Sequence, residues 1–230
     1  MLVDIFSTFD DHNQVFMSFY FLMWVFSLIS VVLFSSSLWV TSAFWVGVIN
    51  VFKDTISGQI FRSFGLNLGG FLNLITALFL FLISVNLSGL IPYVFSPTSH
   101  LVVSFSLGFP LWLSLILSGG SFSLKSVIAS LLPMGAPTLL NPFLVVIETV
   151  SILVRSVTLA VRLIANMSAG HIVLTLIGNY LMVGVTSSMI SLFMLGMIQV
   201  LYTVFEFGIS LIQAYIFCLL IILYSDDHPH

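Results

Sequence analysis

A permanent positive charge stands in the middle of a long apolar run, in the stretch TLAVRLIANMSAGHIVL that covers residues 158–174. The charge belongs to Arg162, and Asn166 and His171 follow it in the same stretch. Arginine keeps its proton in a protein, so it cannot relay one, but it repels protons and attracts carboxylates. A fixed cation of this kind can block direct proton leakage between two half-paths and keep a passing carboxylate ionised.

Three further ionisable side chains lie in nearby apolar runs, those of Glu148, Arg155 and Glu206. Ionisable groups inside a bilayer are costly, so by default they indicate function. At about 100° per residue, Glu148, Arg155 and Arg162 share one face of a helix. Histidine and glutamate exchange protons with water, so His171 and the glutamates are suitable linings for a proton path.

Structural alternatives exist for several of these side chains. Arg162 could pair with Glu206 inside the protein, and Arg155 could reach the membrane surface or pair with Glu148. A lone histidine such as His171 often serves packing alone. Gln213 could act as a simple hydrogen-bond donor between helices.

The composition places the chain among integral membrane proteins. Of its 230 residues, 60% are hydrophobic and only 6% are charged. Such sparse charge argues against nucleic-acid binding, which needs a basic face. The single cysteine, Cys218, excludes an internal disulfide, and the histidines lack metal-ligand spacing. Without a nucleotide-binding loop or a nucleophile motif, we expect no cofactor, no metal and no catalytic site.

Hydrophobic runs predict an all-α membrane protein with about five membrane-embedded helices and one amphipathic surface helix, in a single membrane domain. We expect the first 14 residues to be an N-terminus on the outer side. The segments expected after it are a first span at 15–40, an amphipathic inner-side segment at 43–65, second and third spans within 67–118, and a long tilted hairpin at 140–224.

The predicted hairpin is too long for simple spans. Helices over 140–184 and 187–224 would be about 65 Å and 55 Å long, whereas the hydrocarbon core is about 30 Å thick. Folding the hairpin at residues 185–186 would place Asn166 level with Glu206, with Gln213 on the same face as Glu206. We therefore expect Arg162, Asn166, Glu206 and Gln213 to gather near one depth.

The loop cations predict the orientation. Lys53 and Arg62 lie between the first two spans, and Lys125 lies between the third and fourth. With five spans these loops share one side, which the positive-inside rule makes the inner one. The N-terminus and the hairpin turn then face outside, and the C-terminus faces inside.

Several segments closely resemble subunit a of F-type ATP synthase in its mitochondrial form. They are TLAVRLIANMSAGHIVLTLIG, FEFGISLIQAYIFCLLIILY, residues 86–112 and residues 141–163. The resemblance covers most of the chain from about residue 67 onward. Its motifs are specific because the arginine, the asparagine, Ala-Gly-His and Gln-Ala-Tyr occur in order and at the spacing typical of the family.

The resemblance implies a proton-conducting stator subunit beside a rotating ring of c subunits, each with one carboxylate. Arg162 would be the essential arginine that faces the ring. Its implied partners are the ring, other F0 stator subunits, membrane lipid and protons. The remaining implied site residues are Asn166, His171, Glu206 and Gln213 in an outer half-channel and Glu148 in an inner one.

Residues at two positions favour the mitochondrial inner membrane. Bacterial relatives typically have a carboxylate where His171 stands and a histidine where Glu206 stands. An N-terminus on the intermembrane-space side and a C-terminus in the matrix follow from the orientation. Arg155 is not a general family feature, so it serves either the inner path or structure. Two alternative functions stay open: a proton-translocating subunit of a respiratory oxidoreductase, and a non-conducting membrane anchor.

Overall fold

The computed structural model describes residues 44–91, 96–132 and 140–226, together with the isolated Phe9 and Val25. These ranges are mostly helical and contain no strand. The predicted N-terminus and first span fall outside them, apart from the two isolated residues. The helices in chain order are α2 (Phe44–Ile60), the short 3-10 helix η3 (Phe64–Asn67), α3 (Phe71–Gly89), the 3-10 helix η4 (Pro97–Ser99), α4 (Leu101–Phe122), α5 (Leu124–Ser130), α6 (Asn141–Ser187) and α7 (Met189–Asp226).

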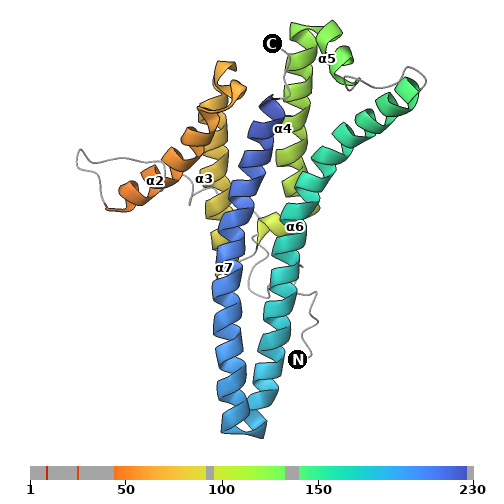
Figure 1. Ribbon diagram of the computed structural model, residues 1–230. Coiled ribbons are helices and arrows are strands. Elements are labelled where there is room, and N and C mark those ends of the chain that lie inside the picture. The colour runs from red at the N-terminus through yellow and green to blue at the C-terminus, as the bar shows by residue number, and fades with distance from the viewer. Residues whose placement is uncertain (1–8, 10–24, 26–43, 92–95, 133–139, 227–230) are drawn as a thin grey trace.

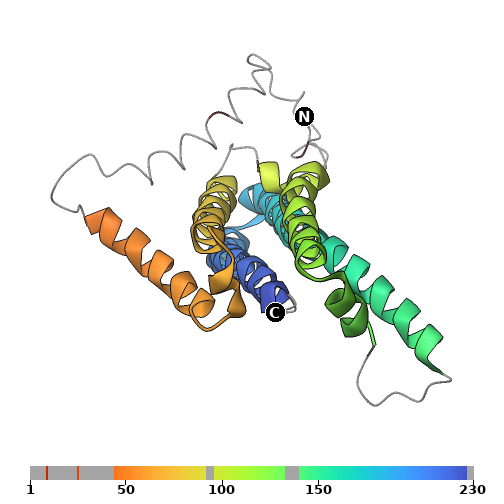
Figure 2. The ribbon, with the colours of Figure 1, turned by 90° about the horizontal axis from the view of Figure 1, so that it is seen from above.

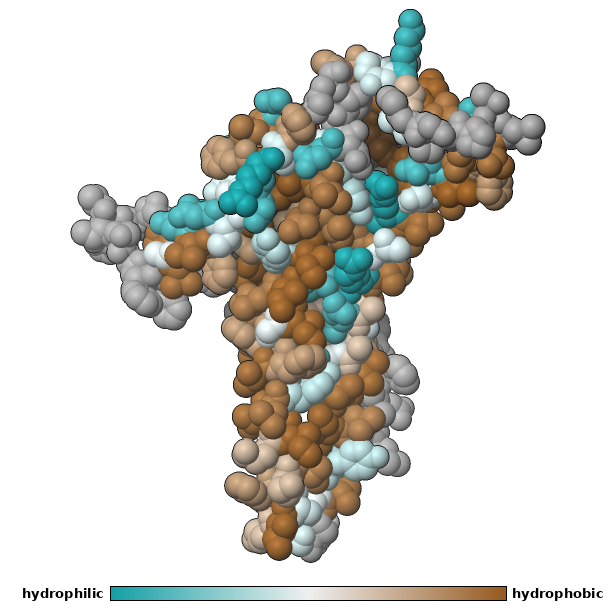
Figure 3. All heavy atoms as spheres, viewed as in Figure 1, coloured by the Kyte–Doolittle hydropathy of each residue, from teal (hydrophilic) through white to brown (hydrophobic). Residues whose placement is uncertain are grey.

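Four of these helices, α3, α4, α6 and α7, are long and apolar enough to cross a membrane. Many of their large apolar side chains point outward, and Met189 and Ile190 are 85% and 80% exposed. Figure 3 shows a largely hydrophobic surface over the hairpin of α6 and α7. Lipid solvates such a surface and water does not, and helices satisfy their own backbone hydrogen bonds in lipid. The predicted all-α membrane fold is therefore confirmed.

The helices α6 and α7 form an antiparallel hairpin that turns at Ser188. Near this turn the Ser191 hydroxyl donates a hydrogen bond to the Gly184 carbonyl oxygen at 3.4 Å. The predicted turn at 185–186 was therefore wrong. The later turn shifts the pairing of the two helices by about one helical turn, which changes the neighbours of the polar side chains.

The helix α6 is bent. Its first part leans away from α7, and its later part runs beside α7 to the turn (Figure 1). The helix α4 packs against α6, and α5 follows α4. Seen from above in Figure 2, α2 and the first part of α6 spread to opposite sides, while α3, α4 and α7 gather between them. Residues of α4, α5 and the first part of α6 line a pocket on this side of the molecule.

A buried apolar cluster holds the hairpin to α2 and α3. It includes Ile56 of α2, Ile75 of α3, Leu163 of α6 and Phe217 of α7, each at most 1% exposed. Burying a side chain of this size stabilises a soluble protein by about 1.5–3 kcal/mol, whereas in lipid tight van der Waals packing supplies the attraction. The cluster gives the polar side chains of α6 and α7 a fixed support.

The helix α2 is amphipathic, as the sequence predicted for residues 43–65. Its Ile56 and Ile60 are fully buried against the cluster, while Lys53 and Asp54 are exposed. The apolar face therefore attaches α2 to the helices that span the membrane, and the charged face remains open.

One end of the molecule gathers η3, α5 and the C-terminal end of α7, opposite the Ser188 turn (Figure 1). The backbone N–H of Phe64, at the start of η3, donates a hydrogen bond of 2.9 Å to Asp226 Oδ1 at the end of α7. Lys125 lies in α5, so this end carries part of the positive charge that the orientation argument used.

Candidate functional site

Polar side chains meet along the contact between α6 and α7. Asn166 Nδ2 donates a hydrogen bond of 2.7 Å to Gln213 Oε1, and Gln213 is only 2% exposed. The sequence predicted that these two residues gather at one depth, but it placed Asn166 level with Glu206. The turn at Ser188 instead sets Asn166 opposite Gln213. The hydrogen bond satisfies one polar group from each helix inside an apolar surrounding.

Arg162 lies one helical turn before Asn166, and its side chain is exposed on α6. In the described part of the chain, no hydrogen bond or ion pair joins Arg162 to Glu206. The structure therefore does not show the internal pair that was one alternative for this arginine. Figure 3 shows hydrophilic residues as a short group at the seam of α6 and α7, within a hydrophobic surface. A permanent cation on such an apolar face is costly, so by default it indicates function.

Glu206 of α7 is 3% exposed and has two close neighbours. The Tyr202 hydroxyl, one turn earlier on α7, donates a hydrogen bond of 2.7 Å to Glu206 Oε1. On the other side, a Cβ added at Gly170 of α6 would overlap the Glu206 carboxylate. The carboxylate is therefore held between a hydroxyl of its own helix and the bare backbone of the opposite helix.

His171 follows Gly170 on α6, so it lies at nearly the same depth as Glu206. Its ring is half-buried and meets the ring of Phe9 edge to face, with centroids 6.3 Å apart. Its Nε2 atom is buried without a hydrogen-bond partner among the described residues. No hydrogen bond joins His171 and Glu206 within these residues, so the structure brings them to one level without direct contact.

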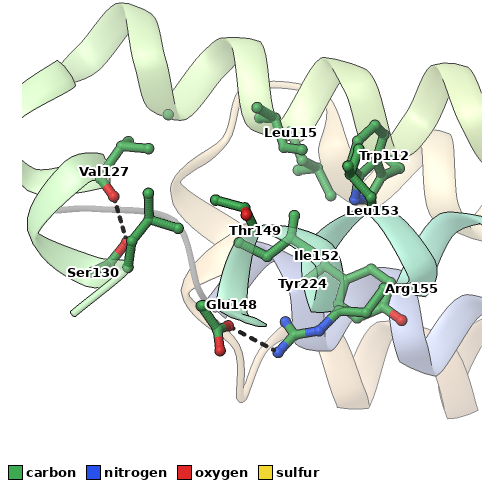
Figure 4. A pocket seen from close by; sticks show the side chains of 13 residues that line it. Trp112, Leu115, Val127, Ser130, Glu148, Thr149, Ile152, Leu153, Arg155 and Tyr224 are labelled. Carbon is green, nitrogen blue, oxygen red and sulfur yellow. Dashed lines mark hydrogen bonds and ion pairs between the residues drawn. The ribbon is translucent and has the colours of Figure 1, made fainter. Parts of the chain in front are cut away.

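A cavity of about 550 Å³ lies at the other end of α6, where this helix leans away from α7 (Figure 4). Glu148 and Arg155 line it, and their side chains form an ion pair of 3.7 Å. The Arg155 guanidinium also lies 5.8 Å from the centre of the Tyr224 ring, within range of a cation–π contact. The wall opposite is apolar and includes Trp112 and Leu115 of α4.

The predicted polar residues thus form two separate groups along α6. One group is the hairpin contact around Asn166, and the other is the Glu148–Arg155 pair at the cavity. Arg162 lies between them along α6, seven residues after Arg155. The two groups are offset along α6 and do not form one continuous line.

Some polar contacts were missed from the sequence. Asn86 of α3 is fully buried, and its Nδ2 donates a hydrogen bond of 3.4 Å to the Ser210 carbonyl oxygen of α7. Its Oδ1 is buried without a partner among the described residues. The sequence offers one signal for this contact, an asparagine inside an apolar run.

The chain matches the protein family described as ATP synthase A chain over residues 15–226. It is 42% identical to the ATP synthase F(0) complex subunit a of Balaenoptera musculus over 155 residues, which are 67% of this chain and 69% of that protein. It is 45% identical to the ATP synthase subunit a of Albinaria caerulea over 157 residues, 68% of this chain and 72% of that protein.

A further relative matches along nearly the full length. The ATP synthase subunit a of Locusta migratoria is 34% identical over 232 aligned positions, and the match covers 99% of each chain. The similarity therefore extends to the N-terminal third, which precedes the segments that carried the resemblance in the sequence. Together with the helical membrane fold, these matches show that the chain belongs to the family of ATP synthase F(0) a subunits, as the sequence predicted.

Proposed function

We propose that this chain is the proton-conducting stator subunit of an F-type ATP synthase. Two offset half-channels deliver protons to and from the carboxylates of a ring of c subunits. The flow of protons turns the ring, and other subunits use the rotation to make ATP. The chain itself is not catalytic. The observations above favour neither a respiratory oxidoreductase subunit nor a non-conducting anchor.

The exposed position of Arg162 is the observation that carries this proposal. The arginine stands on an apolar face of α6, and no ion pair is seen for it within the described residues. A carboxylate on a passing c subunit supplies the missing counter-charge. The same positive charge keeps that carboxylate ionised at the boundary between the half-channels and repels protons that would cross directly.

The outer half-channel is assigned to the hairpin contact. His171 and Glu206 exchange protons, and the Asn166–Gln213 hydrogen bond orients the polar groups beside Arg162. The inner half-channel is assigned to the cavity at Glu148, where this carboxylate forms an ion pair of 3.7 Å with Arg155. Offset entry and exit force each proton to ride the ring.

The electrical work gained when a proton crosses the membrane explains why the two half-channels must be kept separate. One charge that crosses 100 mV yields about 2.3 kcal/mol, and a direct leak would lose that work without turning the ring. Arg162 is suited to this boundary because it cannot give up its proton.

The proposed location is the mitochondrial inner membrane, crossed several times. The Ser188 turn and the N-terminus face the intermembrane space, and the end with α5 and the C-terminus faces the matrix. Partners are the c ring, other F0 stator subunits and membrane lipid.

The direct test replaces Arg162 by alanine in the assembled ATP synthase, reconstituted into liposomes. We expect ATP-driven proton pumping to fall at least 100-fold, because the ring carboxylate loses its counter-charge and protons leak past it. Pumping is followed by a pH-sensitive dye, and passive proton leak is measured in the same vesicles.

The matched control is Lys53→Gln, which removes one exposed positive charge from α2 and should leave pumping unchanged. Native gels check that each variant assembles. Normal coupled pumping in an assembled Arg162→Ala complex would overturn the proposed function.

A further inference from the structure

Glu206 contacts two residues that have no role in the proposed half-channel so far, Tyr202 and Gly170. A carboxylate that is 3% exposed in an apolar surrounding is costly unless it is hydrogen-bonded. Among the described residues, the Tyr202 hydroxyl donates a hydrogen bond to Glu206 Oε1, with an O···O distance of 2.7 Å. A distance of this length is typical of a well-formed O–H···O hydrogen bond.

The positions of Tyr202 and Glu206 along α7 show which end of their hydrogen bond lies closer to the Ser188 turn. Tyr202 lies four residues closer to the Ser188 turn than Glu206, which corresponds to about 6 Å along the helix. Tyr202 is half-buried, whereas Glu206 is buried. The hydroxyl therefore lies between the more open outer part of the hairpin and the enclosed carboxylate.

Gly170 closes the opposite side of the carboxylate. Glycine has no side chain, so the Glu206 carboxylate lies directly against the α6 backbone at this position. A Cβ at residue 170 would overlap the Glu206 oxygens. The carboxylate is thus confined by α6 on one side and meets a proton-carrying group, the Tyr202 hydroxyl, on the other.

We propose that Tyr202 is the outer proton link to Glu206, a role that rests on the half-channel proposed above. A hydronium ion on the outer side gives a proton to the phenol oxygen and becomes water, while the phenol's own proton passes to Glu206 Oε1. One O–H bond breaks on the hydronium ion and one on the phenol, and one O–H bond forms on the phenol and one on Glu206, so the carboxylate becomes neutral and the tyrosine keeps one proton. After Glu206 has passed its proton on to the ring carboxylate, rotation of the hydroxyl restores the Tyr202–Glu206 hydrogen bond.

The test compares Tyr202→Phe with Tyr202→Leu in the assembled complex in liposomes. If the hydroxyl matters, both variants lose proton flow to a similar extent, by about 10- to 100-fold, as expected for a lost hydrogen bond to a charged group. If the ring only fills space, Tyr202→Phe keeps normal flow and only Tyr202→Leu is impaired, which would overturn the proposal.

Tyr180→Phe is the matched control. Tyr180 lies on α6 of the same hairpin, its side chain is 61% exposed, and its hydroxyl is in no hydrogen bond within the described residues. The control should keep normal proton flow. Proton flow is also measured in heavy water. A proton link predicts that Tyr202→Phe changes the ratio of rates in light and heavy water, whereas an unchanged ratio contradicts it.

Glu206→Gln and Arg162→Ala separate the two proposals. If both of these variants abolish ATP-driven proton pumping while Tyr202→Phe behaves like Tyr180→Phe, the half-channel stands and the tyrosine link fails. If neither variant affects flow, the proposed function fails, whatever the result for Tyr202.

Discussion

At the scale of single residues, Gly170 shows how an absent side chain can shape a site. The Glu206 carboxylate occupies the space that a Cβ at residue 170 would need. Gly170→Ala should force either the carboxylate or the two helices to move. Such overpacking typically destabilises a protein by about 1–3 kcal/mol, and misplacing a proton-carrying group by about 1 Å can slow transfer by two orders of magnitude. We expect lower driven proton flow, measured in liposomes.

Gly178→Ala provides the comparison for that change. Gly178 lies on the same helix, and a Cβ there would meet nothing within 4 Å. This variant should keep normal proton flow and assembly. If Gly170→Ala and Gly178→Ala were equally harmless, the tight seat of Glu206 against α6 would be contradicted.

The sequence revealed charged residues better than their neighbours. Arg162, Glu148 and Glu206 stand out because an ionisable side chain in an apolar run is costly and therefore rare. Tyr202 is an ordinary residue for a membrane helix, and Gly170 stood out only as part of the Ala-Gly-His motif, with no sign of its contact with Glu206. Their importance depends on which residue of the opposite helix they meet, and that information exists only once the hairpin is folded.

At the scale of elements, the hairpin turn decides which residues meet. The apolar patterns of 140–184 and 187–224 are strong, so two long helices could be predicted close to the observed Asn141–Ser187 and Met189–Asp226. The turn itself was misplaced, because four of the five residues at 184–188 are glycine, threonine or serine and several of them could end a helix. The later turn shifts the pairing of the two helices by about one helical turn. Asn166 therefore lies opposite Gln213, to which it donates a hydrogen bond, and not level with Glu206 as predicted.

This register predicts energetic coupling between Asn166 and Gln213. Each single change to alanine leaves the other amide buried without its partner, so the second change should add little. We expect a coupling energy of about 0.6 kcal/mol, and up to about 1.7 kcal/mol, as found for hydrogen bonds between membrane helices. Thermal unfolding of the two single variants, the double variant and the unchanged complex measures it.

Asn179 of α6 is exposed and serves as the reference position for that cycle. Asn179→Ala combined with Gln213→Ala should give additive effects. If Asn166 were coupled to Glu206 and not to Gln213, the pairing of the two helices described here would be contradicted and a turn at 185–186 would be favoured.

At the scale of the whole molecule, polarity is concentrated and the outer surface is apolar. The polar groups lie at the hairpin contact, at the cavity beside Glu148, and at the end that holds α5 and the C-terminus. The sequence predicted an all-α membrane protein because a chain with 60% hydrophobic and 6% charged residues must have a surface that lipid solvates and water does not. It could not show the bend of α6 or the cavity beside it, since both depend on how α4 packs against that helix.

The orientation of the whole molecule gives the last prediction. The single cysteine, Cys218, is buried, so Cys218→Ser provides a cysteine-free background. Into this background either Ser188→Cys at the hairpin turn or Lys125→Cys in α5 is introduced; both positions are exposed. A maleimide that cannot cross membranes should label Ser188→Cys from the intermembrane-space side and Lys125→Cys only in inverted vesicles. Lys and Arg in loops favour the inner side, and Lys125 in α5 lies at the end opposite the turn. Labelling of both positions from one side would contradict the hairpin placement, and labelling in the reverse order would invert the outer and inner half-channels.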